Sequence, residues 1–209
     1  MFAYAGNNPI KYTDPDGRSP DLARLKELAK EVHDKGTING VNLYRACSLD
    51  GCFARATILA DQLKKEGFSI QYIIVDNPDT PDKEGKFSYH ISVQVTIDGT
   101  NYVIDPYYSH DLKTQPGLTT RNEWIYGQGC SQNDANNEPA VDKNGNLLIS
   151  SKFAWCFNKR ADMNLTAPEF AQKWLAHFAK IYKNKEEIER MSEEERAKYI
   201  SSYEDYTGD

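Results

Sequence analysis

The sequence predicts an α+β fold, in which a helix that begins near a cysteine packs on an antiparallel sheet and further helices follow. Three observations support this class. Residues 48–67 place apolar side chains on one face of a helix, residues 88–108 alternate apolar and polar side chains around a tight turn, and residues 166–181 return to helical spacing. Strands joined by a tight turn pair antiparallel. The 209 residues fit one domain of ordinary size with a helical tail.

Composition argues against two classes of partner. The net charge is −6 and no basic stripe runs along the chain, so a nucleic-acid-binding surface is not expected. No stretch approaches the roughly 18 apolar residues of a membrane span. The first residues also lack the basic and then apolar pattern of a signal peptide. The chain is long enough to bury a core, although only 39% of its residues are hydrophobic.

The first helix is expected to begin near residue 19. Ser19 is a suitable N-cap, Pro20 fits the first helical position, and Asp21 faces the positive end of the helix dipole. Gly36 supplies the stop. Residues 37–46 then form a loop or a short strand. The buried face of this helix is expected to carry Leu22, Leu25, Leu28 and Val32.

The second helix carries the clearest pattern in the chain. Ser48 or Asp50 is expected to cap its start, and two lysines precede the stop at Gly67. Residues 68–75 are β-branched and aromatic, which predicts a strand. The buried stripe of the helix is expected to comprise Phe53, Ala56, Leu59, Ala60 and Leu63.

A β-hairpin follows, with its turn at Asp98-Gly99. Pro106 ends the second strand, because it has no N–H for the ladder. A two-residue turn places Asp105 opposite Ser92, on the face that also carries His90, whereas a three-residue loop moves Asp105 to the other face. One face of the first strand is apolar and the other polar: Ile91, Val93, Val95 and Ile97 against His90, Ser92, Gln94 and Thr96.

The last hundred residues are less regular. Residues 110–150 are polar and rich in Asn, Gly and Gln, which predicts long surface loops, and residues 152–157 are predicted to form a short strand. Capping boxes at Thr166–Glu169 and Ser192–Glu195 open two further helices, the second of them charged. The stripe of the first of these helices is expected to be Phe170, Trp174, Phe178 and Ile181.

Cys52 is the first candidate for chemistry. It falls in the first turn of its helix, where backbone N–H groups and the dipole favour an anion, and a thiolate is the nucleophilic form of cysteine. A plainer interpretation is a small buried residue, as unpaired cysteines often are.

The hairpin favours the catalytic interpretation. His90 begins one strand and Asp105 ends the next, on one face if the turn has two residues. A histidine base oriented by an aspartate activates cysteine for acyl chemistry. Taken singly, His90 fits a solvated strand position and Asp105 a turn before proline. The three together, in the order Cys52, His90, Asp105, favour a catalytic triad.

The remaining reactive residues fit structural roles. The cysteines lack the spacing of a zinc site and the density of a disulfide scaffold, although Cys130 and Cys156 could be bridged in an oxidising compartment. No phosphate-binding loop follows a strand, so neither a metal nor a cofactor is expected. Trp155 either lines the cleft of the proposed active site or belongs to the core beside two phenylalanines. The histidines expected to be structural are His33, His110 and His177.

The segments GCFARA, YHISVQV and YVIDPYY resemble the bacterial protein-glutaminase family, over roughly residues 45–110. The family pattern is CxxRA opening a helix, YHI or YHV entering a strand, and an aspartate in IDP. Here Cys52 with Arg55, His90 and Asp105 occupy those positions. The resemblance implies a papain-like or transglutaminase-like core and a catalytic triad that deamidates glutamine side chains in proteins.

Other uses of the same triad stay open at the level of sequence. A transglutaminase lets a lysine amine intercept the thioester, and a cysteine protease cuts the main chain. A non-catalytic module that acts by binding a partner is a further alternative. The resemblance implies a protein substrate with an exposed glutamine, and no cofactor.

The opening residues resemble a second family. NPIKYTDPDGR, residues 8–18, is similar to the NPxxxxDPxGL motif that ends the core of Rhs and YD-repeat polymorphic toxins. Arg18 stands where leucine is usual in that motif. That resemblance implies that residues 1–18 are a remnant of the Rhs shell and residues 19–209 are the toxin domain. It further implies a secreted effector, of the type VI kind, delivered into the target-cell cytoplasm and blocked by a cognate immunity protein.

Overall fold

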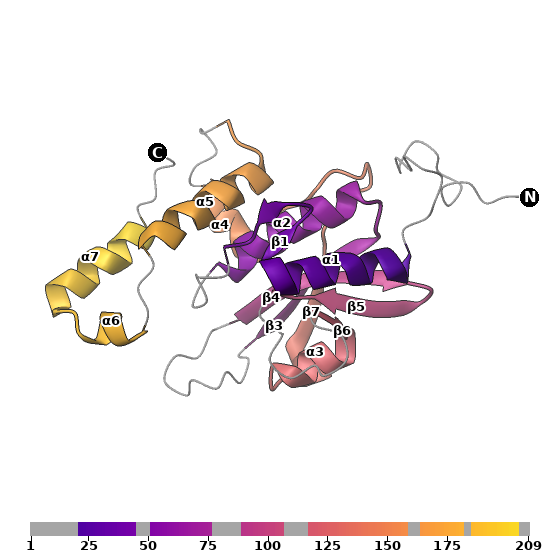
Figure 1. Cartoon of the computed structure of the whole chain (residues 1–209), viewed down its shortest axis with the longest axis horizontal. Coiled ribbons are helices and arrows are strands. Elements are labelled where there is room, and N and C mark those ends of the chain that lie inside the picture. Colours follow the sequence, from indigo (N-terminus) through magenta and orange to yellow (C-terminus); the bar gives the residue numbers. More distant parts are fainter. Residues whose placement is uncertain are drawn as a thin grey trace, which may run out of the picture.

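The computed structural model describes six stretches of the chain, residues 21–44, 51–76, 89–106, 117–158, 164–181 and 185–204. Its centre is a five-stranded sheet in the order β6-β5-β4-β3-β7, and every neighbouring pair is antiparallel. Helices α1 and α2 lie on one face of this sheet and α3 on the other (Figure 1). The strands are β3 (Ile70–Asp76), β4 (Tyr89–Ile97), β5 (Thr100–Ile104), β6 (Leu118–Thr120) and β7 (Ala135–Pro139).

Helix α1 spans Leu22–Lys35 and begins two residues later than the sequence suggests. Its N-cap is Asp21, not Ser19, because the Asp21 carboxylate accepts the backbone N–H of Arg24 at 2.8 Å. Ser19 and Pro20 lie outside the described residues. Gly36 closes the helix in the left-handed region at φ 66°, as predicted. On the predicted face Leu25, Leu28 and Val32 are buried and Leu22 is half-buried.

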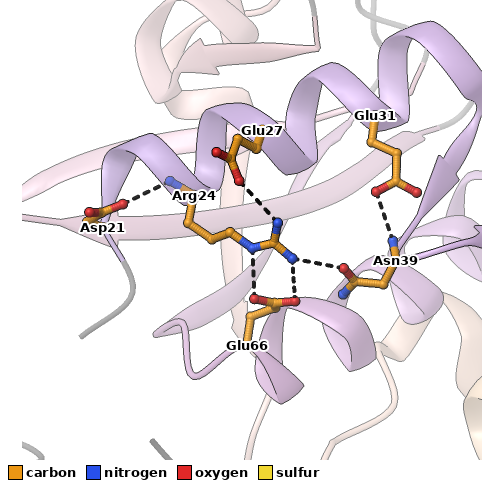
Figure 2. Close-up of polar contacts among 6 residues, drawn as sticks. All are labelled: Asp21, Arg24, Glu27, Glu31, Asn39 and Glu66. Carbon is orange, nitrogen blue, oxygen red and sulfur yellow. Dashed lines mark hydrogen bonds and ion pairs between the residues drawn. The ribbon is translucent and has the colours of Figure 1, made fainter. Parts of the chain in front are cut away.

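A polar cluster fixes α1 to its neighbours (Figure 2). The Arg24 guanidinium donates to both carboxylate oxygens of Glu66, at 3.0 and 2.8 Å, and also to Glu27 and Asn39. Because Glu66 is the C-cap of α2, this fork joins the first turn of α1 to the last turn of α2. Glu31 accepts the backbone N–H of Asn39 in the turn between β1 (Thr37–Ile38) and β2 (Val41–Asn42). Residues 37–42 therefore contain two short strands, where the sequence predicted either a loop or a short strand.

Helix α2 spans Cys52–Lys65 and forms the centre of the main core. Its predicted stripe, Phe53, Ala56, Leu59, Ala60 and Leu63, is buried. The stripe packs with α1, α5 and the sheet face that carries Ile91, Val93 and Val95. The architecture matches the α+β expectation: a cysteine opens a helix that packs on an antiparallel sheet, and helices follow at the C-terminal end.

The hairpin has the register that the sequence predicted for a two-residue turn. Ile97 pairs with Thr100 and Val93 with Ile104, while Asp98 and Gly99 have φ values of 50° and 77°. Two successive residues at positive φ define the type I′ turn expected for Asp-Gly. Asp105 therefore follows Ile104 on the face that carries His90, where the proposed triad needs it.

The prediction of long surface loops over residues 110–150 is wrong for the described part, residues 117–150. Strand β6 pairs with β5, helix α3 (Arg121–Gly127) follows it, and β7 pairs with β3 at the opposite edge of the sheet. β7 has the sequence Ala-Asn-Asn-Glu-Pro, which has no β-branched residue and no alternation. It is held by main-chain pairing and by the Asn137 amide, which donates to the Tyr72 carbonyl and to Gln94.

The strand predicted over residues 152–157 is also wrong, because Ser151–Asn158 form helix α4. Phe153, Cys156 and Phe157 stand three and four residues apart, and this spacing buries one face of a helix. A short apolar run does not distinguish a strand from a buried helix. Trp155 is 49% exposed, so it does not belong to the core.

Three helices end the chain: α5 (Ala167–Ile181), α6 (Lys185–Glu189) and α7 (Glu193–Glu204). Both predicted capping boxes are present, with Glu169 accepting the backbone N–H of Thr166 and Glu195 that of Ser192. In α5 the predicted Phe170, Trp174 and Phe178 are buried. Among the described helices none is long and apolar enough to cross a membrane.

The sheet is buried on both faces, and its two cores are separate. Ile73, Val75 and Val103 pack with Trp124, Ile125 and Cys130 on the α3 face. Cys156 lies in the main core on the other face, so no disulfide joins it to Cys130. The bridge considered from the sequence is therefore not formed, because the sheet stands between the two thiols.

Candidate active site

Cys52 is the first residue of α2, and its position depends on the preceding glycine. Gly51 is the N-cap, with φ 85° and ψ 13°. The N-cap is therefore not Ser48 or Asp50, which the sequence predicted, and both of these lie outside the described residues. The N–H groups and the dipole at a helix N-terminus favour an anion such as a thiolate. The Cys52 side chain is partly exposed, as a nucleophile requires.

Gly51→Ala is expected to destabilise the protein by about 2–4 kcal/mol and to lower the reactivity of Cys52. A Cβ at this position would lie 2.8 Å from Leu175 Cδ2 and 3.0 Å from a ring carbon of Trp174, and the backbone φ is positive. Helix α2 would have to shift, and Cys52 with it. Urea unfolding measures the first effect, and the rate of Cys52 alkylation by iodoacetamide measures the second.

Gly40→Ala is the matched control. Gly40 also has a positive φ, +76°, but an added Cβ there meets nothing within 4 Å. It is expected to cost about 1 kcal/mol of backbone strain and to leave Cys52 alkylation unchanged. Equal losses of stability in the two variants would contradict the steric argument for Gly51.

His90 and Asp105 are brought together at the end of the sheet where β4 begins and β5 ends. His90 Nε2 lies 2.6 Å from Asp105 Oδ2, within hydrogen-bond distance. The Asp105 side chain is 2% exposed and that of His90 16%. A buried carboxylate that accepts from an imidazole N–H fixes the tautomer of the ring and favours its protonated form.

Cys52 reaches the same imidazole. Burial works against the charge on His90, but the Asp105 carboxylate and a side-chain hydrogen bond with Cys52 outweigh it and raise the pKa of His90 to about 10. Because Asp105 occupies Nε2, Nδ1 is the ring nitrogen left to exchange a proton with the thiol. The structure thus brings the three residues proposed from the sequence, Cys52, His90 and Asp105, into one cluster.

The raised pKa of His90 predicts a fall in stability at alkaline pH. His90 titrates near 6.5 in the unfolded chain and near 10 in the fold, so the stabilising charge is fully present below pH 6.5 and lost as pH rises through about 10. NMR titration of the His90 ring is expected to give a midpoint near 10, and urea unfolding to give a stability that falls between these values. His33→Gln is the control, because it removes an imidazole on α1 and should leave both results unchanged. A His90 midpoint near 6.5 would contradict the prediction.

Trp124 also contacts this cluster, and it was not identified as a site residue from the sequence. The Trp124 indole N–H donates to Asp105 Oδ2 at 2.8 Å, and the indole ring stacks on His90 with centroids 5.6 Å apart and planes at 26°. Trp124 is fully buried in α3. The available signal was the capping box Thr120–Glu123, which opens a helix directly before the apolar pair at 124–125.

The other candidates lie elsewhere. His33 is near the end of α1, beside the Asp34 carboxylate, and His177 is in α5 against the ring of Phe178. His110 and Cys47 lie outside the described residues. Within the six described stretches, no group of three His, Cys, Asp or Glu side chains is arranged to hold a metal ion.

No protein-family model and no curated protein sequence matches the chain. Two solved structures are similar to it. One is the NMR structure of protein-glutaminase from Chryseobacterium proteolyticum, with 16% identity and a TM-score of 0.48 over 79% of this chain and 90% of that one. The other is a crystal structure of protein-glutaminase, with 17% identity and a TM-score of 0.49 over 80% of this chain and 91% of that one.

Proposed function

We propose that the protein is a cysteine-dependent amidohydrolase that converts glutamine side chains of a protein substrate to glutamate. The observation that carries this proposal is the His90 imidazole, which contacts a buried carboxylate through Nε2 and interacts with the side chain of a cysteine at a helix N-terminus. A thiol, a base and an orienting carboxylate are the groups that acyl transfer from an amide requires.

In the proposed reaction Cys52 passes its proton to His90, and the thiolate attacks the carbon of the side-chain carboxamide. The C–N bond then breaks, His90 returns the proton to the leaving nitrogen, and ammonia departs from a thioester. Water, deprotonated by His90, attacks the thioester; the C–S bond breaks and leaves a glutamate side chain and the free thiol. The raised pKa of His90 supports its role as the base that accepts the Cys52 proton.

The backbone N–H of Cys52 is proposed to stabilise the oxyanion. It belongs to the first turn of α2, whose N–H groups have no acceptor within the helix. One such donor contributes a few kcal/mol of transition-state stabilisation in other acyl-transfer enzymes.

The choice of glutamine rests on the three short motifs around Cys52, His90 and Asp105. The test is intact-mass spectrometry of proteins from a cell lysate treated with the wild-type chain or with Cys52→Ala. A gain of about one mass unit with release of ammonia, in the wild-type sample alone, is the expected result. Crosslinked products would indicate a transglutaminase, and fragments a protease. An effect on cells that Cys52→Ala retains would indicate a binding module.

We further propose that residues 19–209 act as the toxin domain of a secreted polymorphic toxin, delivered into the cytoplasm of a target cell. The support is the motif at residues 8–18, which lies outside the described residues. Expression inside bacterial cells is expected to stop growth with the wild-type chain and not with Cys52→Ala. Normal growth with an active wild-type enzyme would contradict the toxin role and leave the amidohydrolase proposal standing.

A further inference from the structure

Trp124 touches both partners of the His90–Asp105 pair. Its Nε1–H donates to Oδ2 of Asp105, the same oxygen that lies 2.6 Å from His90 Nε2. Its ring also covers one face of the His90 imidazole. Two directional contacts from one rigid side chain restrict the rotation of the carboxylate and of the imidazole together.

The surroundings of Trp124 hold the indole in place. Helix α3 is anchored at its start by the capping box Thr120–Glu123, and Thr120 is the last residue of β6, which pairs with β5 next to Asp105. The ring is fully buried with apolar side chains from the sheet and the α3 region: Ile73, Val75, Val103, Ile125 and Cys130. The orientation of the ring is therefore fixed by the sheet edge and by α3.

We propose that Trp124 is a positioning residue of the active site: its N–H fixes the Asp105 carboxylate and its ring fixes the plane of His90. Asp105 Oδ2 accepts two hydrogen bonds from groups at fixed angles, so its position relative to Nε2 is set by both. Without the indole N–H, Asp105 Oδ2 loses one of the two hydrogen bonds that set its position, and the carboxylate holds the imidazole less firmly. The inference rests on the proposed function for the reaction, but the arrangement can be tested without a substrate.

The test compares Trp124→Phe, which keeps an aromatic ring and removes the N–H, with Trp124→Leu, which removes both contacts. We expect kcat to fall about 10- to 100-fold in Trp124→Phe and further in Trp124→Leu, with KM within about twofold of wild type in both. Leu25→Val is the control, because Leu25 is fully buried in the main core, on the other face of the sheet from Trp124. It is expected to lower stability slightly and to leave kcat unchanged.

Two readouts separate positioning from a merely structural role. The first is the rate of Cys52 alkylation against pH, followed by peptide mass spectrometry. The dependence of this rate on pH should change in Trp124→Phe, because the pKa of His90 falls when the carboxylate is held less firmly. The second is a double-mutant cycle with Asp105→Ala, which removes the oxygen that the indole N–H contacts, so the two losses of kcat should be clearly less than additive.

The outcomes are distinguishable from failure of the proposed function. Absence of glutamine deamidation with an altered alkylation profile in Trp124→Phe would reject the substrate and support the positioning role. A Trp124→Phe variant with wild-type kcat, an unchanged dependence of Cys52 alkylation on pH, or additive losses in the cycle would overturn that role. Because alkylation needs no substrate, a folded variant always gives one of these results, and Trp124→Phe is chosen over Trp124→Leu for its smaller change in volume.

Discussion

Cys52→Ala is expected to lower the rate of glutamine deamidation by about 10⁴-fold or more, because it removes the atom that forms the thioester. The loss should appear in kcat, while binding of the protein substrate remains. Stability should change little, since Cys52 is only partly buried and its backbone position is set by Gly51 and helix α2. Ammonia release from a glutamine-containing protein measures activity, and urea unfolding measures stability.

Cys156→Ala is the control for this experiment. Its thiol is 2% exposed in the main core, so the substitution should cost about 1–2 kcal/mol of stability and leave kcat unchanged. A Cys52→Ala variant that still deamidates, or a Cys156→Ala variant that is folded and inactive, would place the nucleophile elsewhere. The His90 pKa should also fall in Cys52→Ala, because the hydrogen bond with Cys52 raises it.

Asp105→Ala has the second large effect, and it should act on both activity and stability. It leaves the His90 and Trp124 N–H groups facing an empty, buried position. We expect a loss of about 3–5 kcal/mol in the free energy of unfolding and of about 10³- to 10⁴-fold in kcat. Urea unfolding and the deamidation assay measure the two losses.

Asp105→Asn separates charge from geometry. The hydrogen bonds from His90 and Trp124 go to the same oxygen, Oδ2, so an amide oxygen at that position can accept these two while the negative charge is lost. The expected loss is about 10- to 100-fold in kcat with most of the stability retained, and the pKa of His90 should fall towards its ordinary value. Losses of stability and activity in Asp105→Asn as large as those in Asp105→Ala would contradict this separation of the charge of Asp105 from its hydrogen-bond geometry.

Much of the candidate site could be predicted from the sequence because its parts are set by local rules. The apolar stripe after Cys52 fixes a helix and places the cysteine at its start. The Asp98-Gly99 pair fixes a two-residue turn, and the turn fixes which face of the hairpin carries Asp105. In both cases the determining residues are close along the chain, so their effect does not depend on the rest of the fold.

The errors fall where distant segments decide the structure. Residues 135–139 form a strand only because the edge of β3 offers main-chain partners, and a sequence of Ala, Asn, Glu and Pro carries no sign of it. Residues 151–158 are a helix whose apolar run was too short to distinguish from a strand. The N-caps are Asp21 and Gly51, whereas the sequence predicted other residues of a suitable type, Ser19 for the first helix and Ser48 or Asp50 for the second.

The sequence by itself determined the helix that begins with Cys52, the hairpin register and the shared face of His90 and Asp105, since helix and turn geometry depend on neighbours in the chain. Only the tertiary structure decided that the imidazole contacts the carboxylate and interacts with the thiol, and that Trp124 contacts both His90 and Asp105. The physical reason is that hydrogen bonds need distances of about 3 Å between side chains that lie on separate segments of the chain. Such distances are fixed by how helices α2 and α3 pack on opposite faces of the same sheet.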